Sequence, residues 1–326
     1  MDKSTQDPNP FDQLIIECQD DTTQIHARYE THRTNRNAQY RTKLLSPDFP
    51  GWQIDEILGK LHRQPTDPPF VDPRHNLTLY ARPPQHIRDL VAEIQRDIED
   101  VAPSIWFTPS SQLHMTTLEI ASCRPQLEVE ELVSHLQGHG IVPDLADYTF
   151  HHRTRLVKPM ISYDATAMAL SFLPATGLET DTVQNGKDGG YTYHHLRRDV
   201  SEMVTATGLR MKPRYIALSA HITIARFITQ DGFLVKSPGQ EGAERVDGER
   251  VAALVERVEK INERLREKYW PGEDAVMSAK GEWLVGQERG LEFCKGTSFY
   301  GGGEDVLTGK GFVPLRLWIN PGNTKC

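Results

Sequence analysis

Two His-x-Thr motifs are the clearest chemical signal in this sequence. One consists of His114 and Thr116, the other of His221 and Thr223, and each lies in a run that favours a β-strand, LHMTTLEI and YIALSAHITIARF. Successive side chains on a strand point to opposite faces, so each histidine shares a face with the threonine two positions later. Each strand therefore presents one imidazole beside one hydroxyl.

Two histidines can divide acid and base work near neutral pH, because an unperturbed imidazole titrates at roughly 6.5. One imidazole can take a proton from water while the other, protonated, gives a proton to a departing ribose oxygen. The two threonine hydroxyls can donate to phosphoryl oxygens. The pair thus suits hydrolysis of a cyclic phosphodiester without a metal. The alternative is a pair of ordinary core or surface histidines, and the matched placement of the motifs argues against it.

Two further His-x-Thr sequences occur, His32 with Thr34 and His152 with Thr154. Both have an arginine in the middle and no place in the repeated order of elements described next. We therefore predict that both lie on the surface or in loops. His152 is the stronger competitor, since FHHRTRLV could also form a strand.

The two motif strands occupy equivalent places in an order of strand, helix, strand, helix that occurs twice. Hydrophobic periodicity and β-favouring runs place the first set at residues 77–81, 87–101, 113–120 and 126–137, and the second at 161–174, 193–204, 215–227 and 251–265. This order predicts an internally duplicated α+β fold. We expect a catalytic domain over residues 71–326 and a mostly helical N-terminal extension over residues 1–70.

Composition narrows the class of protein. The chain has 326 residues with 38% hydrophobic and 25% charged residues, as in an ordinary globular protein. The net charge of −8 argues against a surface that grips long duplex nucleic acid. The four cysteines are scattered without zinc or disulfide spacing, and neither a secretion signal nor an apolar membrane span is present. A cytoplasmic or nuclear protein is expected.

With both motifs in view, the sequence resembles the 2H phosphoesterase superfamily. HITIARF is similar to the second motif of bacterial 2′–5′ RNA ligase-like members. DPRHNLTLYARPP and KGTSFYGGG are similar to a fungal branch often labelled RNA ligase/cyclic nucleotide phosphodiesterase. The resemblance covers roughly residues 70–303. It implies a bilobal, internally duplicated α+β fold in which two antiparallel sheets flank a central cleft, with helices outside.

The resemblance also implies an activity, namely metal-independent hydrolysis of 2′,3′-cyclic phosphates of nucleotides or RNA ends. His114, Thr116, His221 and Thr223 would be the catalytic residues, with no cofactor. The expected partner is a small nucleotide or an RNA end, with no duplex nucleic acid and no membrane, and we expect a monomer. A non-catalytic nucleotide or RNA-end binding module and a 2′–5′ RNA ligase-like activity are the alternatives.

Two further residues are candidates for substrate binding. Arg226 matches the arginine that ends the family's second motif and could hold a phosphate. Strict alternation puts Arg226 on the face opposite His221, so that role requires a β-bulge; otherwise Arg226 is a solvated strand residue. Tyr300, in SFYGGG, could stack on a base or bond a phosphate, or it could be a strand-end aromatic before a glycine turn.

Other patterns are set aside. GGGEDVLTGKG lacks the first glycine and the final Ser or Thr of a phosphate-binding loop. The neighbouring histidines His151/His152 and His194/His195 are not expected to bind metal, because adjacent strand side chains diverge and no carboxylate or cysteine lies at zinc-site spacing. We expect His195 to form a surface pair with Asp199, four residues later on a helix.

Overall fold

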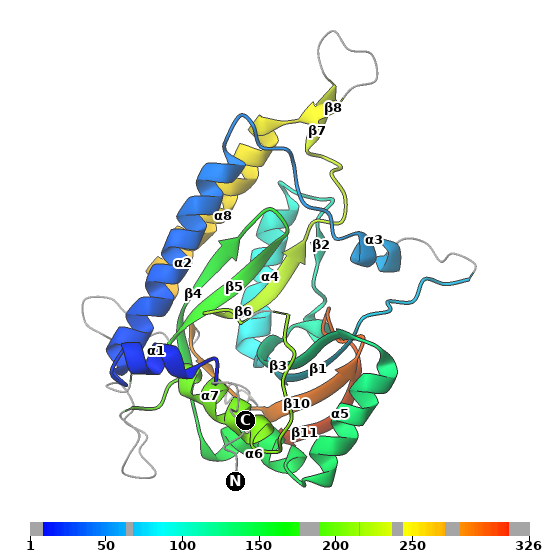
Figure 1. Cartoon of the computed structure of the whole chain (residues 1–326). Coiled ribbons are helices and arrows are strands. Elements are labelled where there is room, and N and C mark those ends of the chain that lie inside the picture. Colours follow the sequence, from blue (N-terminus) through cyan, green and yellow to red (C-terminus); the bar gives the residue numbers. More distant parts are fainter. Residues whose placement is uncertain are drawn as a thin grey trace, which may run out of the picture.

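The structure, a computed structural model, describes residues 9–62, 68–176, 190–214, 216–236, 244–270 and 281–312. Within these ranges a four-stranded sheet in the order β11-β10-β1-β3 faces a five-stranded sheet in the order β2-β6-β5-β4-β9, and all named strand pairs are antiparallel (Figure 1). A small ribbon joins β7 (Leu234–Lys236) to β8 (Glu244–Val246). The predicted α+β class with two antiparallel sheets is confirmed.

Helices cover the outer face of the four-stranded sheet. Its strands are β1 (His75–Ala81), β3 (Met115–Arg124), β10 (Arg289–Gly296) and β11 (Glu304–Lys310). The expected helix after β3 is present as α5 (Gln126–Gly138), and it packs on β1 and β10. A further helix that the periodicity did not predict, α6 (Val142–His151), packs on β10 and β11.

The five-stranded sheet contains the second motif. Its strands are β2 (Trp106–Phe107), β4 (Arg155–Tyr163), β5 (Ala167–Pro174), β6 (Ala220–Arg226) and β9 (Trp283–Leu284). The predicted run at 161–174 is a hairpin, because the Asp164 side chain accepts hydrogen bonds from the backbone of Thr166 and Ala167 and turns the chain.

The helices of this second sheet have the amphipathic pattern expected from the sequence. In α4 (Gln85–Glu99) the residues Ile87, Leu90, Val91, Ile94 and Ile98 are all buried on one stripe. α8 (Gly248–Tyr269) begins where the Asp247 side chain caps it, and it packs along β4. One apolar stripe on each helix is thus buried against the body of the molecule.

The two halves of the chain interlock. α4 follows β1 in sequence but packs against α8 and β6, whereas α7 (Tyr193–Thr205) precedes β6 but contacts β3 and α6. β10 and β11, near the end of the described chain, complete the sheet that contains β1. Each sheet therefore combines strands from both halves, and the internal duplication stays a prediction.

The N-terminal helices α1 (Asp12–Glu17), α2 (Thr22–Leu44) and α3 (Glu56–His62) lie against the same body. α2 runs beside α8 and contacts β4 and β5 (Figure 1). A separate apolar cluster seals this contact; its buried members are Leu14, Ile15, Cys18, Ile25, Tyr29, Val157 and Leu173. The extension is therefore packed on the five-stranded sheet.

The paired histidines of α7 anchor this packing. His194 accepts or donates through Nδ1 to the Tyr29 hydroxyl at 2.9 Å, and its Nε2 lies 2.9 Å from the carbonyl oxygen of Phe11. His195 is buried, and its Nε2 lies 2.7 Å from Asp20 Oδ1. The predicted surface pair of His195 with Asp199 is wrong, because packing of the N-terminal segment on α7 buries His195 and gives it Asp20 instead.

The structure also places the two competing His-x-Thr sequences. His32 and Thr34 lie within α2 rather than a loop, and Arg33 between them is only 5% exposed. His32 and Thr34 are exposed, so the predicted surface position is confirmed for both, whereas the helix turns Arg33 toward the sheet and buries it. His152 follows α6 and its ring stacks on that of Tyr148, so FHHRTRLV does not form one continuous strand. No helix in the described ranges is both long and apolar enough to cross a membrane.

Candidate active site

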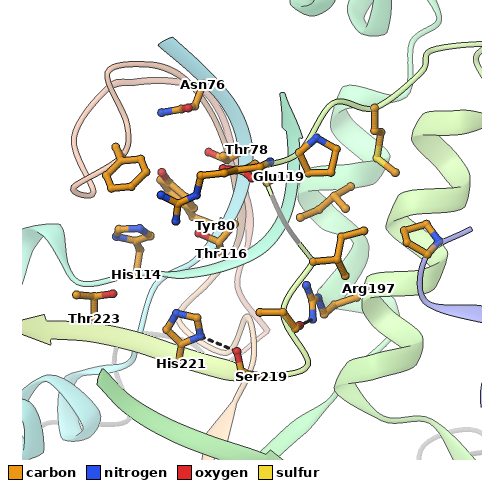
Figure 2. A pocket seen from close by; sticks show the side chains of 18 of the residues that line it. Asn76, Thr78, Tyr80, His114, Thr116, Glu119, Arg197, Ser219, His221 and Thr223 are labelled. Atoms are coloured by element: carbon orange, nitrogen blue, oxygen red, sulfur yellow. Dashed lines mark hydrogen bonds between the residues drawn. The ribbon is translucent and has the colours of Figure 1, made fainter. Parts of the chain in front are cut away.

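A cavity of about 120 Å³ opens between the two sheets. The strands β1 and β3 line it from one sheet and β6 lines it from the other. The four predicted catalytic residues, His114, Thr116, His221 and Thr223, all line this cavity (Figure 2). Arg226 lines it as well. Segments 107 residues apart in sequence thus meet at one place.

His114 lies directly before β3, at the end of the turn η1 (Ser110–Gln112). Its Nδ1 lies 2.8 Å from the carbonyl oxygen of Gln112, and its ring lies 4.2 Å from the Tyr80 ring, centroid to centroid. A carbonyl oxygen can only accept, so this hydrogen bond assigns the proton to Nδ1. In the neutral ring Nε2 therefore carries the free lone pair.

The glycine turn after Tyr300 packs against His114. Gly301 has a φ of +85°, and a Cβ atom built there would lie 2.0 Å from Gln112 O and 2.7 Å from His114 Nδ1. The Gly301 carbonyl oxygen accepts a hydrogen bond from Arg82 Nη1 at 3.2 Å. The positive φ and the close approach both require glycine here, and the turn fixes the backbone that orients His114.

His221 lies in β6 and faces the cavity with Thr223. Its Nδ1 is 2.9 Å from the Ser219 hydroxyl, as the dashed line in Figure 2 marks. A hydroxyl can donate or accept, so either tautomer of His221 is compatible with this contact. The two histidines therefore differ in what fixes their protons.

A β-bulge in β6 brings Arg226 into the cavity. Thr223 lies opposite Ala169 and Arg226 opposite Ala167, so β6 uses three residues where β5 uses two. Ala167 and Ala169 share a face, and Arg226 therefore shares the face of Thr223. This is the bulge that a phosphate-binding role for Arg226 required, and the prediction of a solvated strand residue on the opposite face is not met.

β3, which follows His114 and contains Thr116, has a β-bulge like that of β6, at the same distance from its motif threonine. Thr116 lies opposite Tyr80 and Glu119 opposite Thr78, so β3 also uses three residues where β1 uses two. Glu119 therefore lies on the same face as Thr116, whereas strict alternation would place Leu118 there. Glu119 and Arg226 hold equivalent positions, each three residues after the motif threonine.

Aromatic residues and one carboxylate surround the Arg226 guanidinium. It lies 5.4 Å from the ring centre of Phe299 and 5.6 Å from that of Tyr300, and its Nη1 is 3.7 Å from Asp55 Oδ2. The Tyr300 hydroxyl accepts from Arg74 at 2.9 Å and donates to Asp55 at 2.6 Å. Phe299 lines the cavity and Tyr300 does not. A direct contact of Tyr300 with substrate stays a prediction.

The sequence did not single out Arg197 of α7, which also lines the cavity. Its Nε donates to Thr117 O at 3.1 Å and its Nη1 to Ala217 O at 2.6 Å, so it ties the bulge of β3 to the segment before β6. Tyr80 was missed as well, although its place two residues after Thr78 in LTLYA is a signal that alternation could have used.

Burial and nearby arginines shift both histidines in the same direction. Burial, with Arg82 and Arg226 nearby, lowers the pKa of His114 to about 4. Burial, with Arg197 and Arg226 nearby, lowers the pKa of His221 to about 4. Desolvation and positive neighbours both disfavour the imidazolium. Both rings are therefore neutral at pH 7 before a substrate binds, in contrast to the expected division into one neutral and one protonated ring.

Metal-capable side chains gather elsewhere in the described part of the chain. Glu292, Cys294 and Asp305 place one ligand atom each within 4.8 Å of one another, on β10 and β11. The Glu292 carboxylate already accepts from Arg82 at 2.5 Å and from Arg289 at 3.1 Å, and the Cys294 thiol lies 2.8 Å from Asp305. These contacts account for the cluster within the protein.

Comparison with known proteins gives distant structural likenesses. No family model and no curated protein matches the sequence. A conserved protein of unknown function from Agrobacterium tumefaciens is 14% identical, with 76% of this chain and 94% of that chain covered and a TM-score of 0.40. Usb1 of Kluyveromyces marxianus, solved with uridine monophosphate, is 13% identical, with 73% and 98% covered and a TM-score of 0.35.

Proposed function

We propose that this protein hydrolyses 2′,3′-cyclic phosphates of nucleotides or RNA ends by a two-histidine, metal-independent mechanism. The observation that carries the proposal is the convergence of two imidazoles from separate sheets on one cavity, each with a threonine of its own strand beside it. One guanidinium, Arg226, lies on the same face as His221. This set supplies a base, an acid, and donors for the phosphoryl oxygens.

In this mechanism His114 is the base. Its neutral Nε2 takes a proton from a water molecule, and the water oxygen forms a bond to phosphorus while one bond from phosphorus to a ribose oxygen breaks. His221, protonated in the substrate complex, gives its proton to that leaving oxygen. Thr116 and Thr223 donate to the non-bridging oxygens, and Arg226 balances their negative charge.

The hydrogen bond at Nδ1 supports His114 as the base. The Gln112 carbonyl holds the His114 proton on Nδ1, so the atom left to face the cavity is a proton acceptor whenever the ring is neutral. The Ser219 hydroxyl can instead accept from Nδ1 of a protonated His221. The local partners thus favour different roles for two residues that the sequence leaves equivalent.

Turnover without a metal is the first expected result. Uridine 2′,3′-cyclic phosphate should be opened to a nucleoside monophosphate at the same rate with and without EDTA, because the two histidines supply the proton transfers. Chromatography of the products measures this directly. Loss of activity with EDTA would contradict the metal-free mechanism, and binding without turnover would favour the non-catalytic binding module.

The pH dependence should be unusual for a pair of histidines. Because the free protein holds the pKa of each histidine at about 4, the protonated acid becomes scarcer as pH rises, and kcat/KM should fall between pH 5 and pH 8. The bound phosphate is an anion that raises the pKa of the imidazoles, so kcat should peak at a higher pH than kcat/KM. Steady-state kinetics from pH 4 to 9 give both profiles as values of the coupled pair. A kcat/KM maximum at pH 7 or above would contradict the pKa directions found here.

A further inference from the structure

The face of β6 that carries His221 and Thr223 also lines a second, larger cavity of about 340 Å³. Ser219, His221, Thr223 and Arg226 line both cavities, so the second one opens directly beside the proposed reaction site. Its floor is formed by side chains of β5, the strand that pairs with β6. β5 offers three small side chains there, Ala167, Ala169 and Ser171, together with Phe172.

The opposite wall comes from α2 of the N-terminal extension. Four residues of this helix line the cavity at the spacing i, i+3, i+4 and i+7, which is one face of an α-helix: Tyr29, His32, Arg33 and Arg36. The family resemblance begins near residue 70, so this wall belongs to the part of the chain outside it.

The lining of the second cavity is strongly positive. It contains the four arginines Arg33, Arg36, Arg214 and Arg226, whereas the one acidic residue among the described lining residues is Asp164. Asp164 Oδ2 pairs with Arg36 Nη2 at 2.6 Å. The excess of arginines points to an anionic occupant, although the whole chain carries a net charge of −8.

Arg33 is an independent sign of a missing ligand. The residue is 5% exposed, and its Nη1 donates to the Lys158 carbonyl oxygen at 2.7 Å. Among the described residues its Nε and Nη2, which are buried, have no hydrogen-bond partner, and its guanidinium carbon lies 5.3 Å from the centre of the Trp270 ring. Leaving guanidinium N–H groups buried and unpaired is costly, and Arg33 lines the cavity, so an anion bound there would supply the missing acceptors.

We propose that the second cavity binds a second phosphate group of the substrate, one nucleoside away from the phosphate that reacts at His114 and His221. Arg33 and Arg36 of α2 are its ligands. This inference rests on the proposed function, since it extends the same site to its substrate class. The second phosphate is either a 5′-terminal phosphate of a mononucleotide or the internucleotide phosphate of an RNA end.

Calorimetric binding tests this without any need for turnover. The probes are uridine 3′-monophosphate, uridine 3′,5′-bisphosphate and the dinucleotide UpUp. The wild-type protein should bind at least one of the two ligands with a second phosphate about tenfold or more tightly than the monophosphate, the effect of one charge-assisted hydrogen bond. Preference for the bisphosphate identifies a terminal phosphate, and preference for UpUp alone identifies an internucleotide phosphate.

Arg36→Gln should remove that preference, because it deletes a cationic ligand with a largely accessible side chain. Arg28→Gln is the matched control, since Arg28 lies on the same helix, pairs with Glu17 and does not line the cavity. Arg36→Gln is chosen over a change at Arg33, whose bond to β4 also supports the fold. Equal affinity for all three probes, or a preference that survives in Arg36→Gln, would overturn the inference. Absence of cyclic phosphate hydrolysis would overturn the proposed function alone.

Discussion

Replacing either His114 or His221 by alanine is expected to lower kcat for a 2′,3′-cyclic nucleotide by about 10²–10⁴-fold, the usual effect of removing a general acid or base. Both rings line the same cavity, and neither can take the other's place, because His114 lies just before β3 and His221 lies in β6, each with a different hydrogen-bond partner. Steady-state turnover of purified variants with unchanged circular dichroism spectra measures the effect.

His152→Ala is the control for these variants. His152 belongs to another His-x-Thr sequence but stacks on Tyr148 and lines neither cavity. Its replacement should leave kcat within about twofold of the wild type, as is usual for a side chain remote from the reacting atoms. A large loss in His152→Ala with none in His114→Ala would show that the wrong first motif was chosen.

The two histidine variants should also respond differently to the leaving group. A phosphodiester with a p-nitrophenol leaving group needs little protonation of the departing oxygen, so His221→Ala should recover most of its lost activity on such a substrate. His114→Ala should stay impaired, because the attacking water still needs a base. Recovery in His114→Ala instead would reverse the assignment of acid and base.

Gly301→Ala is expected to lower kcat by about 10²-fold, although Gly301 carries no chemical group. The added Cβ would lie 2.0 Å from Gln112 O and 2.7 Å from His114 Nδ1, so the turn or the imidazole must shift. A displacement of about 1 Å in a catalytic group can cost this much. The loss should appear in kcat, since the substituted atom faces His114 rather than the substrate.

The neighbouring glycine provides a matched control. A Cβ at Gly302 would meet only Thr297 O, at 3.7 Å, which is ordinary van der Waals contact. Gly302→Ala should therefore keep near-wild-type kcat and melting temperature. If Gly301→Ala matched Gly302→Ala in kcat, the turn would not be what positions His114.

Local patterns in the sequence predicted many of the elements and the candidate residues that they carry. Period-two alternation placed each motif threonine beside its histidine, and the apolar stripe of residues 87–101 predicted α4. The expected α+β class follows from the same periodicities, whereas the two antiparallel sheets were implied by the family resemblance. These features depend on residues a few positions apart in the chain, so they can be predicted from a single sequence.

The bulges needed the tertiary structure. Whether Arg226 faces the cavity depends on its pairing with Ala167 across β5, and whether Glu119 does depends on Thr78 across β1. Strand register is set by the partner strand, which alternation along one strand does not reveal. The proton positions have a similar origin, because Gln112 O and the surrounding burial determine which nitrogen of His114 is free and how low its pKa falls.

By itself, the sequence determined which residues are the candidates for the chemistry, namely the two histidines and two threonines of the paired motifs. Only the tertiary structure placed the second cavity beside the motif strands, because α2 reaches β5 through contacts such as Arg33 with Ser171, 138 residues apart. Contacts over such separations depend on how the whole chain packs, and a local pattern contains no information about them. The helical extension thereby becomes one wall of the cavity beside the motif strands.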